Sequence, residues 1–164
     1  MMQPGRRRDA PTGVSGYTLV ELVVVISILG ILAAVMGPRF FDQQTFSQRS
    51  YADELASALR AAQKAAVISG CPAKLTLTSS TYTANQQVAA GNGCNTASST
   101  YSTPLLGGDG SAISGTAPSG ITVSPTGSFL FDTQGRLISS PGTTLTIGSR
   151  TITIVAGTGF VQVQ

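Results

Sequence analysis

The sequence predicts an α+β protein in which one long N-terminal helix packs on an antiparallel β-sheet. Up to about residue 69 the chain carries first an apolar run and then an amphipathic helical pattern. Beyond Pro72 the helical period disappears, and short runs rich in Val, Ile, Thr and Phe alternate with clusters of Gly, Ser and Asn. Such runs are typical of strands joined by turns. A long helix followed by many strands is the element order of an α+β fold.

The first helical segment is long and apolar enough to cross a membrane. From Tyr17 to Met36 there are 20 residues with Glu21 as the only charge. At about 1.5 Å per residue this helix is about 30 Å long, the thickness of the hydrocarbon core. The arginines at positions 6–8 place the N-terminal flank in the cytoplasm. We therefore predict a single-pass inner-membrane protein whose C-terminal domain lies in the periplasm.

The charge of Glu21 requires an explanation, because a carboxylate in a membrane helix costs up to a few kcal/mol. Thr18-x-x-Glu21 is a capping box, and the helix dipole favours an acidic residue in the first turn, so Glu21 could simply start an anchor. Two further interpretations are a secretory signal peptide and a buried soluble helix. The run is longer than a signal peptide needs, its small-residue site is followed by Pro38, and its uninterrupted length argues against a soluble helix.

The segment Gly16-Tyr17-Thr18-Leu19-Val20-Glu21 with the apolar helix after it resembles the class III signal of type IV pilins and type II secretion pseudopilins. The resemblance implies that a prepilin peptidase removes residues 1–16 as a leader, cleaving between Gly16 and Tyr17, and methylates the new amine of Tyr17. Glycine suits the cleavage site because it presents no side chain. The Tyr17 amine lies four residues before Glu21, within reach on one helix face or from a neighbouring subunit. Glu21 would then neutralise that amine and set the register of assembly.

Two residues of the apolar segment also match pilin positions. In pilins a Gly and a Pro bound a stretch that loses helicity in the filament, and the resemblance assigns this assembly role to Gly30 and Pro38. From chemistry alone, Pro38 should disturb the helix because its ring removes an amide donor and clashes with the preceding turn. Gly30-x-x-x-Ala34 fits a small-residue helix contact equally well. The leader is longer than in common pilins, which is consistent with a start at Met2 or later, and Tyr17 replaces the commoner Phe.

The helical pattern continues beyond the apolar segment and ends near residue 69. Apolar residues recur at steps of three and four, with charged residues between them, as an amphipathic helix requires. These residues are Tyr51, Leu55, Leu59, Ala62 and Ala66. Gly70 and Pro72 then form a stop signal. We expect one helix from about Thr18 to Ser69, divided into a transmembrane and assembly segment (17–37) and the amphipathic start of a periplasmic domain (38–164).

Cys71 and Cys94 are the only cysteines, and a periplasmic location allows a disulfide between them. The bond would close a loop of about 24 residues, which the loop-entropy model values at about 3 kcal/mol. The alternative is a pair of free thiols. Two cysteines in a chain without histidine argue against a zinc site.

The region after the helix is predicted to be β-rich. Residues 75–78 and 81–84 should form a hairpin, and 85–120 should form surface loops with a strand near 101–106, the expected partner-specific surface. The Gly107–Gly110 segment contains one carboxylate, too few for a calcium loop, so we interpret it as a turn. Further strands are expected at 121–124, 128–131, 136–138, 145–147, 150–156 and 160–164. Gly148-Ser149 is suited to a two-residue type II′ turn.

Two motifs in this region refine the resemblance. Phe131-Asp132-Thr133-Gln134-Gly135-Arg136 resembles a turn of the GspH/FimT minor-pilin group, and Gly157-Thr158-Gly159-Phe160-Val161 resembles that group's last strand. Pro38-Arg39-Phe40 is similar instead to pilins of the mannose-sensitive haemagglutinin type.

Composition argues against an enzyme. The chain has no histidine, and neither a serine with a lysine nor paired carboxylates stand out, so we predict no catalytic residues, cofactor or metal. Without residues 1–16, seven basic and six acidic side chains remain of the original 10 and 7. This near-neutral balance makes nucleic acid an improbable partner.

We therefore expect a minor pilin or pseudopilin, a structural subunit of a type IV pilus or a type II secretion pseudopilus. The resemblance implies as partners the prepilin peptidase, other pilin or pseudopilin subunits, an inner-membrane assembly platform and membrane lipid. The alternative is a filament-tip subunit that binds DNA for natural transformation. Its usual footprint is a basic patch, and here only Arg136, Arg150 and Lys74 are candidates.

Overall fold

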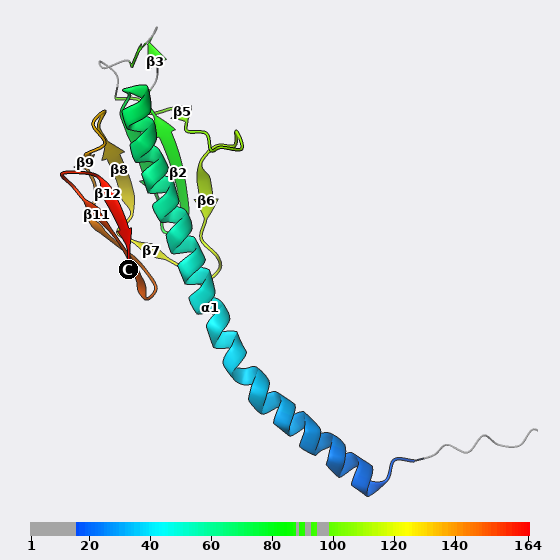
Figure 1. Ribbon diagram of the computed structural model, residues 1–164. Helices are drawn as coiled ribbons and strands as arrows, with labels where there is room; N and C mark the ends of the chain where they lie inside the picture. The colour runs from blue at the N-terminus through cyan, green and yellow to red at the C-terminus, as the bar shows by residue number, and fades with distance from the viewer. Residues whose placement is uncertain (1–15, 88, 91–92, 95–98) are drawn as a thin grey trace, which may run out of the picture. The chain divides into compact units, whose positions relative to one another are not determined.

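The computed structural model in Figure 1 describes residues 16–87, 89–90, 93–94 and 99–164; of residues 34–42 and 89–90 it describes only the backbone. The predicted leader, apart from Gly16, lies outside the described residues. The chain divides into two compact units, Met1–Phe41 and Asp42–Gln164. Each unit is described by itself below.

A long helix, α1 (Leu19–Ser69), extends over both units. The prediction of one helix to residue 69 is confirmed, and so is its stop signal, because Gly70 has a φ of +66° in the left-handed region that favours glycine. The helix is continuous through Pro38, so the predicted disturbance does not interrupt it. The side chain of Pro38 lies outside the described residues.

Among the residues whose side chains are described, no helical stretch is both long and apolar enough to span a membrane. The predicted span ends at Met36, and its side chains from 34 to 36 are outside that description.

In the second unit, one face of α1 contributes to the core. The five apolar residues of the predicted amphipathic stripe, from Tyr51 to Ala66, are each at most 1% exposed. This stripe contacts apolar side chains of the strands, and the largest of these are Phe129, Phe131, Leu75, Leu77, Leu145, Ile147, Ile152, Ile154 and Val161. The predicted buried face of the helix is therefore confirmed.

The strands form two main sheets beside α1 (Figure 1), both antiparallel. The first has the order β5-β2-β1-β8-β9, with β6 also paired to β2. Its strands are β1 (Ala73–Leu77), β2 (Thr81–Gln86), β5 (Thr103–Pro104), β6 (Ser114–Thr116), β8 (Gly127–Phe131) and β9 (Leu137–Ser139). The second has the order β12-β11-β10-β7. Its strands are β7 (Val123–Ser124), β10 (Thr144–Ile147), β11 (Arg150–Val155) and β12 (Phe160–Val163).

The predicted α+β fold, a long helix packed on antiparallel β-structure, is confirmed, and its strands are divided between two main sheets. The chain leaves the second sheet after β7 and enters the first at β8, and Pro125 lies at this change. Proline has no amide hydrogen for a ladder, so the strand cannot simply continue there. A Cβ atom at Gly127, which has φ +145°, would lie 3.0 Å from Pro141, so the backbone passes close to the chain that leads into β10.

Both predicted hairpins are confirmed. β1 and β2 pair antiparallel, with Leu77 opposite Tyr82 next to the turn. In the β10–β11 hairpin Ile147 pairs with Arg150, Gly148 has φ +59°, and Ser149 does not have a positive φ. This combination is that of a type II′ turn.

The segment predicted as loops contains more structure than expected. It holds β6, the short pair β3 (Ala89–Ala90) and β4 (Gly93–Cys94), and a bridge between Leu106 and Ala112. The strand predicted near 101–106 is present as the short β5. Gly107–Gly110 forms the predicted turn, with the Gly110 amide donating to the Gly107 carbonyl at 3.0 Å.

Candidate processing and assembly site

Gly16 and Tyr17 precede α1 and lie outside any regular structure. A Cβ at Gly16 would meet no atom within 4 Å, and Tyr17 is 84% exposed. The peptide bond between these residues is therefore accessible and free of the helical hydrogen bonds that a protease would have to break.

Thr18 caps the start of α1. Its carbonyl accepts from the Leu22 amide at 3.2 Å, and its Oγ1 accepts from the Glu21 amide at 3.2 Å. Half of the predicted capping box is thus present, and it uses the backbone of Glu21 rather than its side chain.

The Glu21 side chain lies on the same face as Tyr17. The two residues line one hollow of about 320 Å³ together with Leu22 and Val25. Among the described residues, the Glu21 carboxylate has neither a hydrogen-bond donor nor a cationic partner. The structure thus brings together two of the predicted site residues and leaves the carboxylate available for a partner outside the described residues.

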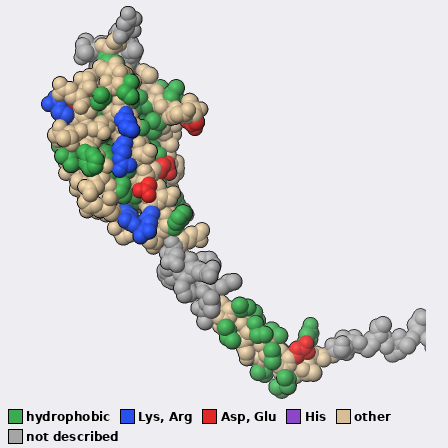
Figure 2. Space-filling view, in the orientation of Figure 1, with side chains coloured by type: hydrophobic (Ala, Val, Ile, Leu, Met, Phe, Trp, Pro, Cys, Tyr) green, Lys and Arg blue, Asp and Glu red, His purple; other side chains and the backbone are tan. Residues whose placement is uncertain are grey.

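Apart from Glu21 and Ser27, the helix between Leu19 and Leu32 is apolar, and its side chains are exposed within the first unit. Its large aliphatic side chains are between 46% and 80% exposed, and Figure 2 shows them as a green surface on this segment. Gly30 lies among them, and a Cβ there would meet nothing within 4 Å. Such a surface in water requires a cover supplied from outside the unit.

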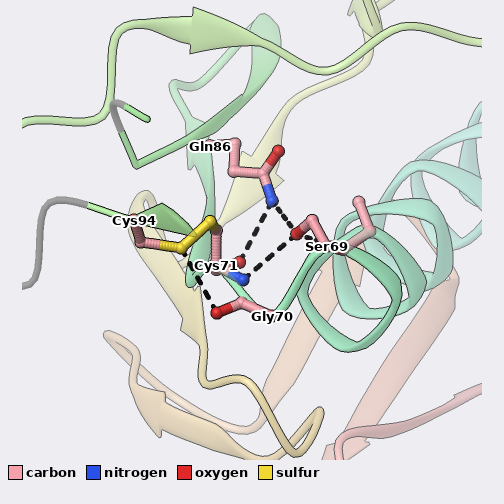
Figure 3. The surroundings of a disulfide bond; sticks show 6 residues. Ser69, Gly70, Cys71, Gln86 and Cys94 are labelled. Atoms are coloured by element: carbon pink, nitrogen blue, oxygen red, sulfur yellow. Dashed lines mark hydrogen bonds between the residues drawn. A yellow bond between two sulfur atoms is a disulfide. The ribbon is translucent and has the colours of Figure 1, made fainter. Parts of the chain in front are cut away.

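The predicted disulfide between Cys71 and Cys94 is confirmed, with a Cα–Cα distance of 5.4 Å (Figure 3). Hydrogen bonds surround it at the end of α1. The Cys71 amide donates to Ser69 Oγ at 3.1 Å, and Gln86 Nε2 donates to the Cys71 carbonyl at 3.2 Å and to Ser69 Oγ. The Cys94 sulfur lies 3.2 Å from the Gly70 carbonyl oxygen. The bond therefore fastens β4 to the C-terminal end of the helix.

The turn between β8 and β9 is organised by Asp132. Its Oδ1 accepts from the amides of Gln134 at 3.0 Å and Arg136 at 2.8 Å, and its Oδ2 accepts from Arg136 Nε at 2.8 Å. Desolvation raises the pKa of Asp132, but these hydrogen bonds and the arginine charge outweigh it, so the pKa lies below its usual value. Gly135 has φ +79°, which the turn requires.

Gln63 of α1 joins this turn to the β11–β12 turn. Its Nε2 donates to the carbonyls of Gly135 at 3.0 Å and Thr158 at 2.8 Å. A Cβ at Gly159 would overlap the Gly135 carbonyl oxygen. The two glycine motifs singled out in the sequence therefore meet against one helix side chain. Sequence reasoning missed Gln63, since nothing in its spacing distinguishes it from the other polar residues of the helix.

The basic residues considered for nucleic acid do not form one patch by themselves. Arg136 pairs with Asp132, and Lys74 Nζ lies 4.9 Å from the centre of the Tyr101 ring. Arg150 instead lines a hollow of about 230 Å³ with Arg49, Asp53 and Val163.

Arg49 belongs to a set that the sequence analysis did not single out. Arg49, Arg60 and Lys64 share one face of α1, because steps of 11 and 4 residues return to nearly the same helix direction. Figure 2 shows Lys and Arg side chains in a row on the second unit, with acidic side chains beside them.

Two models of known families match this chain. Residues 12–37 match the prokaryotic N-terminal methylation motif, and residues 51–159, more than half of the chain, match the type II transport protein GspH. The chain belongs to the GspH family. It is a member of the type IV pilin and pseudopilin group with a class III signal peptide. The family consists of structural pilins and pseudopilins, which assemble with other pilin subunits and are membrane-anchored.

Individual relatives match over about a third of the chain. A fimbrial protein of Pseudomonas aeruginosa is 40% identical over 55 residues, which are 34% of this chain and 36% of the relative. The type IV narrow pilus major component PilA5 of Thermus thermophilus is 42% identical over 53 residues, 32% and 46% of the two chains. The type IV major pilin protein PilA of Myxococcus xanthus is 47% identical over 49 residues, 30% and 22%. The chain thus spans less than half the length of these relatives, and no solved structure matches it.

Proposed function

We propose that this protein is a minor pilin or pseudopilin, a structural subunit of a type IV pilus or a type II secretion pseudopilus. A prepilin peptidase cleaves between Gly16 and Tyr17 and methylates the Tyr17 amine. An inner-membrane assembly platform then moves the subunit from the lipid, where residues 17–37 hold it, into the filament. Family membership and the accessible bond before α1 support this proposal.

The observation that carries the proposal is the shared hollow of Tyr17 and Glu21, in which the carboxylate has no cationic partner among the described residues. After cleavage the Tyr17 amine is positively charged, and a charge in an apolar setting is stabilised when it is paired and hydrogen-bonded. Glu21 neutralises the amine of an adjoining subunit, which also fixes the axial register of the two helices. In the filament, the exposed apolar side chains between Leu19 and Leu32 of two adjoining subunits cover one another.

The membrane placement follows from the same segment. Residues 1–16 lie in the cytoplasm before cleavage, and residues 38–164 lie in the periplasm. Gly30 and Pro38 bound the part of the helix that changes during assembly.

The experiment compares Glu21→Ala and Glu21→Gln with the wild type in cells that have a working prepilin peptidase. Both variants should be cleaved, should carry a methylated Tyr17 and should remain in the membrane fraction, but should be absent from sheared filaments. Intact mass measures cleavage and methylation, and immunoblots of the two fractions measure assembly. Gly16→Asp is the matched control, because it should block cleavage and leave the full-length precursor in the membrane. Recovery of Glu21→Ala in filaments at the wild-type level would contradict the role of Glu21, and an uncleaved wild-type chain would contradict the proposed function as a whole.

A further inference from the structure

The exposed part of α1 in the second unit has two flanks of opposite charge. On one flank Arg49 and Asp53 line the 230 Å³ hollow with Arg150 from the β10–β11 hairpin. On the other flank Glu54 and the small residues that follow it line a groove of about 380 Å³, which is also lined by Gly107 and Gly108. The two flanks are separate patches of one surface, and neither has a role in the processing site at the start of the chain.

The carboxylate of the groove is held in place. The Tyr82 hydroxyl donates to Glu54 Oε1 at 2.6 Å, and Tyr82 is only 4% exposed. Burial and then this hydrogen bond raise the pKa of Tyr82, so the hydroxyl remains a donor at physiological pH. Gly115 permits the contact, because a Cβ there would overlap both Glu54 and the Tyr82 ring. Among the described residues, Glu54 has no cationic partner. The ion pair found among them joins Asp132 and Arg136.

The groove suits a long cationic side chain. Ser57, Ala58 and Ala61 form its helical wall, and Gly107 and Gly108 form part of the opposite side. These small residues leave room for an aliphatic stem, whose charged head would reach the fixed carboxylate at the edge. Arginine fits this geometry well, because its planar guanidinium can donate two parallel hydrogen bonds to one carboxylate.

The other flank supplies such side chains. Among the described residues, neither Arg49 nor Arg150 has an ion pair within the distance of a salt bridge, although Asp53 lines the same hollow. Two guanidinium groups beside one carboxylate leave the hollow with a net positive charge. Arg60 and Lys64 extend the positive charge along the same face of the helix.

We propose that the Glu54 groove of one subunit binds Arg150, supported by Arg49, of a second copy of this chain. Charge complementarity selects this occupant, since cations and a carboxylate without an ion pair among the described residues lie on one molecule but on different patches. A contact between two different patches is heterologous, so it joins two copies head to tail rather than as a closed symmetric dimer. The inference thus rests on the proposed function as a filament subunit and adds a contact between the periplasmic domains.

Cysteine cross-linking of the full-length protein in cells tests the contact. One copy with the first epitope tag carries Gly108→Cys, and a second copy with another tag carries Ser149→Cys. Position 108 has room for a Cβ, Ser149 is exposed beside Arg150, and both charged groups are retained. We expect a mixed, oxidation-dependent dimer when both copies are present and no cross-linked dimer when either variant is expressed alone. The native cysteines are already bonded to each other.

Charge exchange tests whether the pair is direct. Glu54→Arg in the Gly108→Cys copy, or Arg150→Glu in the Ser149→Cys copy, should by itself abolish the mixed dimer. The two substitutions together, each in its own copy, should restore it. Lys74→Glu removes a cation outside both flanks and should leave the dimer unchanged. Thermal unfolding followed by circular dichroism checks that each variant is folded.

The outcomes separate this inference from the proposed function. Entry of both tagged copies into filaments without a mixed dimer would overturn the inference and leave the proposed function intact. A cross-link only to a different pilin subunit would overturn the choice of a second copy. Absence of both filaments and mixed dimers would remove the proposed function and the inference with it.

Discussion

The two parts of α1 belong to one helix but meet opposite requirements. Between Leu19 and Leu32 the large apolar side chains are exposed, and none of the side chains described in this unit is buried. Between Tyr51 and Ala66 the apolar residues occupy one stripe, and that stripe is buried on the sheets. The difference supports the proposal that lipid or other subunits cover the first part, whereas the second part holds its own domain together.

A pair of matched leucines gives the largest expected contrast between these parts. Leu59 is 0% exposed and Leu29 is 57% exposed. Leu59→Ala should lower the free energy of unfolding by about 2–5 kcal/mol, because it leaves a cavity in the core. Leu29→Ala should leave the unfolding of the second unit unchanged. Urea unfolding of the detergent-solubilised protein, followed by circular dichroism, measures both, and equal destabilisation would remove the distinction between the two parts.

The disulfide at the end of the buried part should have the next largest effect. Cys71→Ser should lower the free energy of unfolding by about 2–4 kcal/mol, since the bond restricts the unfolded chain. Cys94→Ser and the double variant should have the same effect, because all three remove one bond. Alkylation of unfolded, unreduced wild-type protein should find no reactive thiol, and two reactive thiols would show that the bond does not form in the cell.

The contact of Gln63 with the two glycine turns is expected to matter less. Gln63→Ala removes the donor to the carbonyls of Gly135 and Thr158 and should cost about 1–2 kcal/mol. Gln134→Ala is the control, because among the described residues that side chain makes no hydrogen bond. Urea unfolding measures both variants, and a similar effect of the two would mean that Gln63 does not join the turns to the helix.

The smallest effect should come from the charge of Asp132, whose pKa is lower in the folded protein than its ordinary value of 3.8. A carboxyl of this kind stabilises the fold fully above its unfolded pKa, and the stabilisation is lost as the pH falls through the folded pKa. We therefore expect Asp132→Asn to destabilise the protein above about pH 4 and the difference from wild type to shrink at lower pH. A series of thermal unfolding curves over this range measures it, and a difference that grows on acidification would contradict the assigned direction.

Local chemistry determines a large part of the fold. The helix end at Gly70, the amphipathic stripe and the hairpin at Gly148 depend on residues close in sequence, so periodicity and turn preferences predicted them. The partition of the strands into two sheets depends on pairings between distant segments, such as β1 with β8. The short β6 was missed because its Ser-Gly-Thr sequence carries no alternating pattern, and its strand conformation depends on pairing with β2.

The candidate site divides in the same way. The motif around Gly16, Tyr17 and Glu21 is contiguous, so the sequence by itself determined the residues of the proposed processing site and the family to which they point. Only the tertiary structure placed Glu54 beside Tyr82 and Arg49 beside Arg150, which are 28 and 101 residues apart. Proximity between distant residues is decided by how α1 packs on the sheets, because burial of the apolar stripe fixes which polar side chains remain at its two edges.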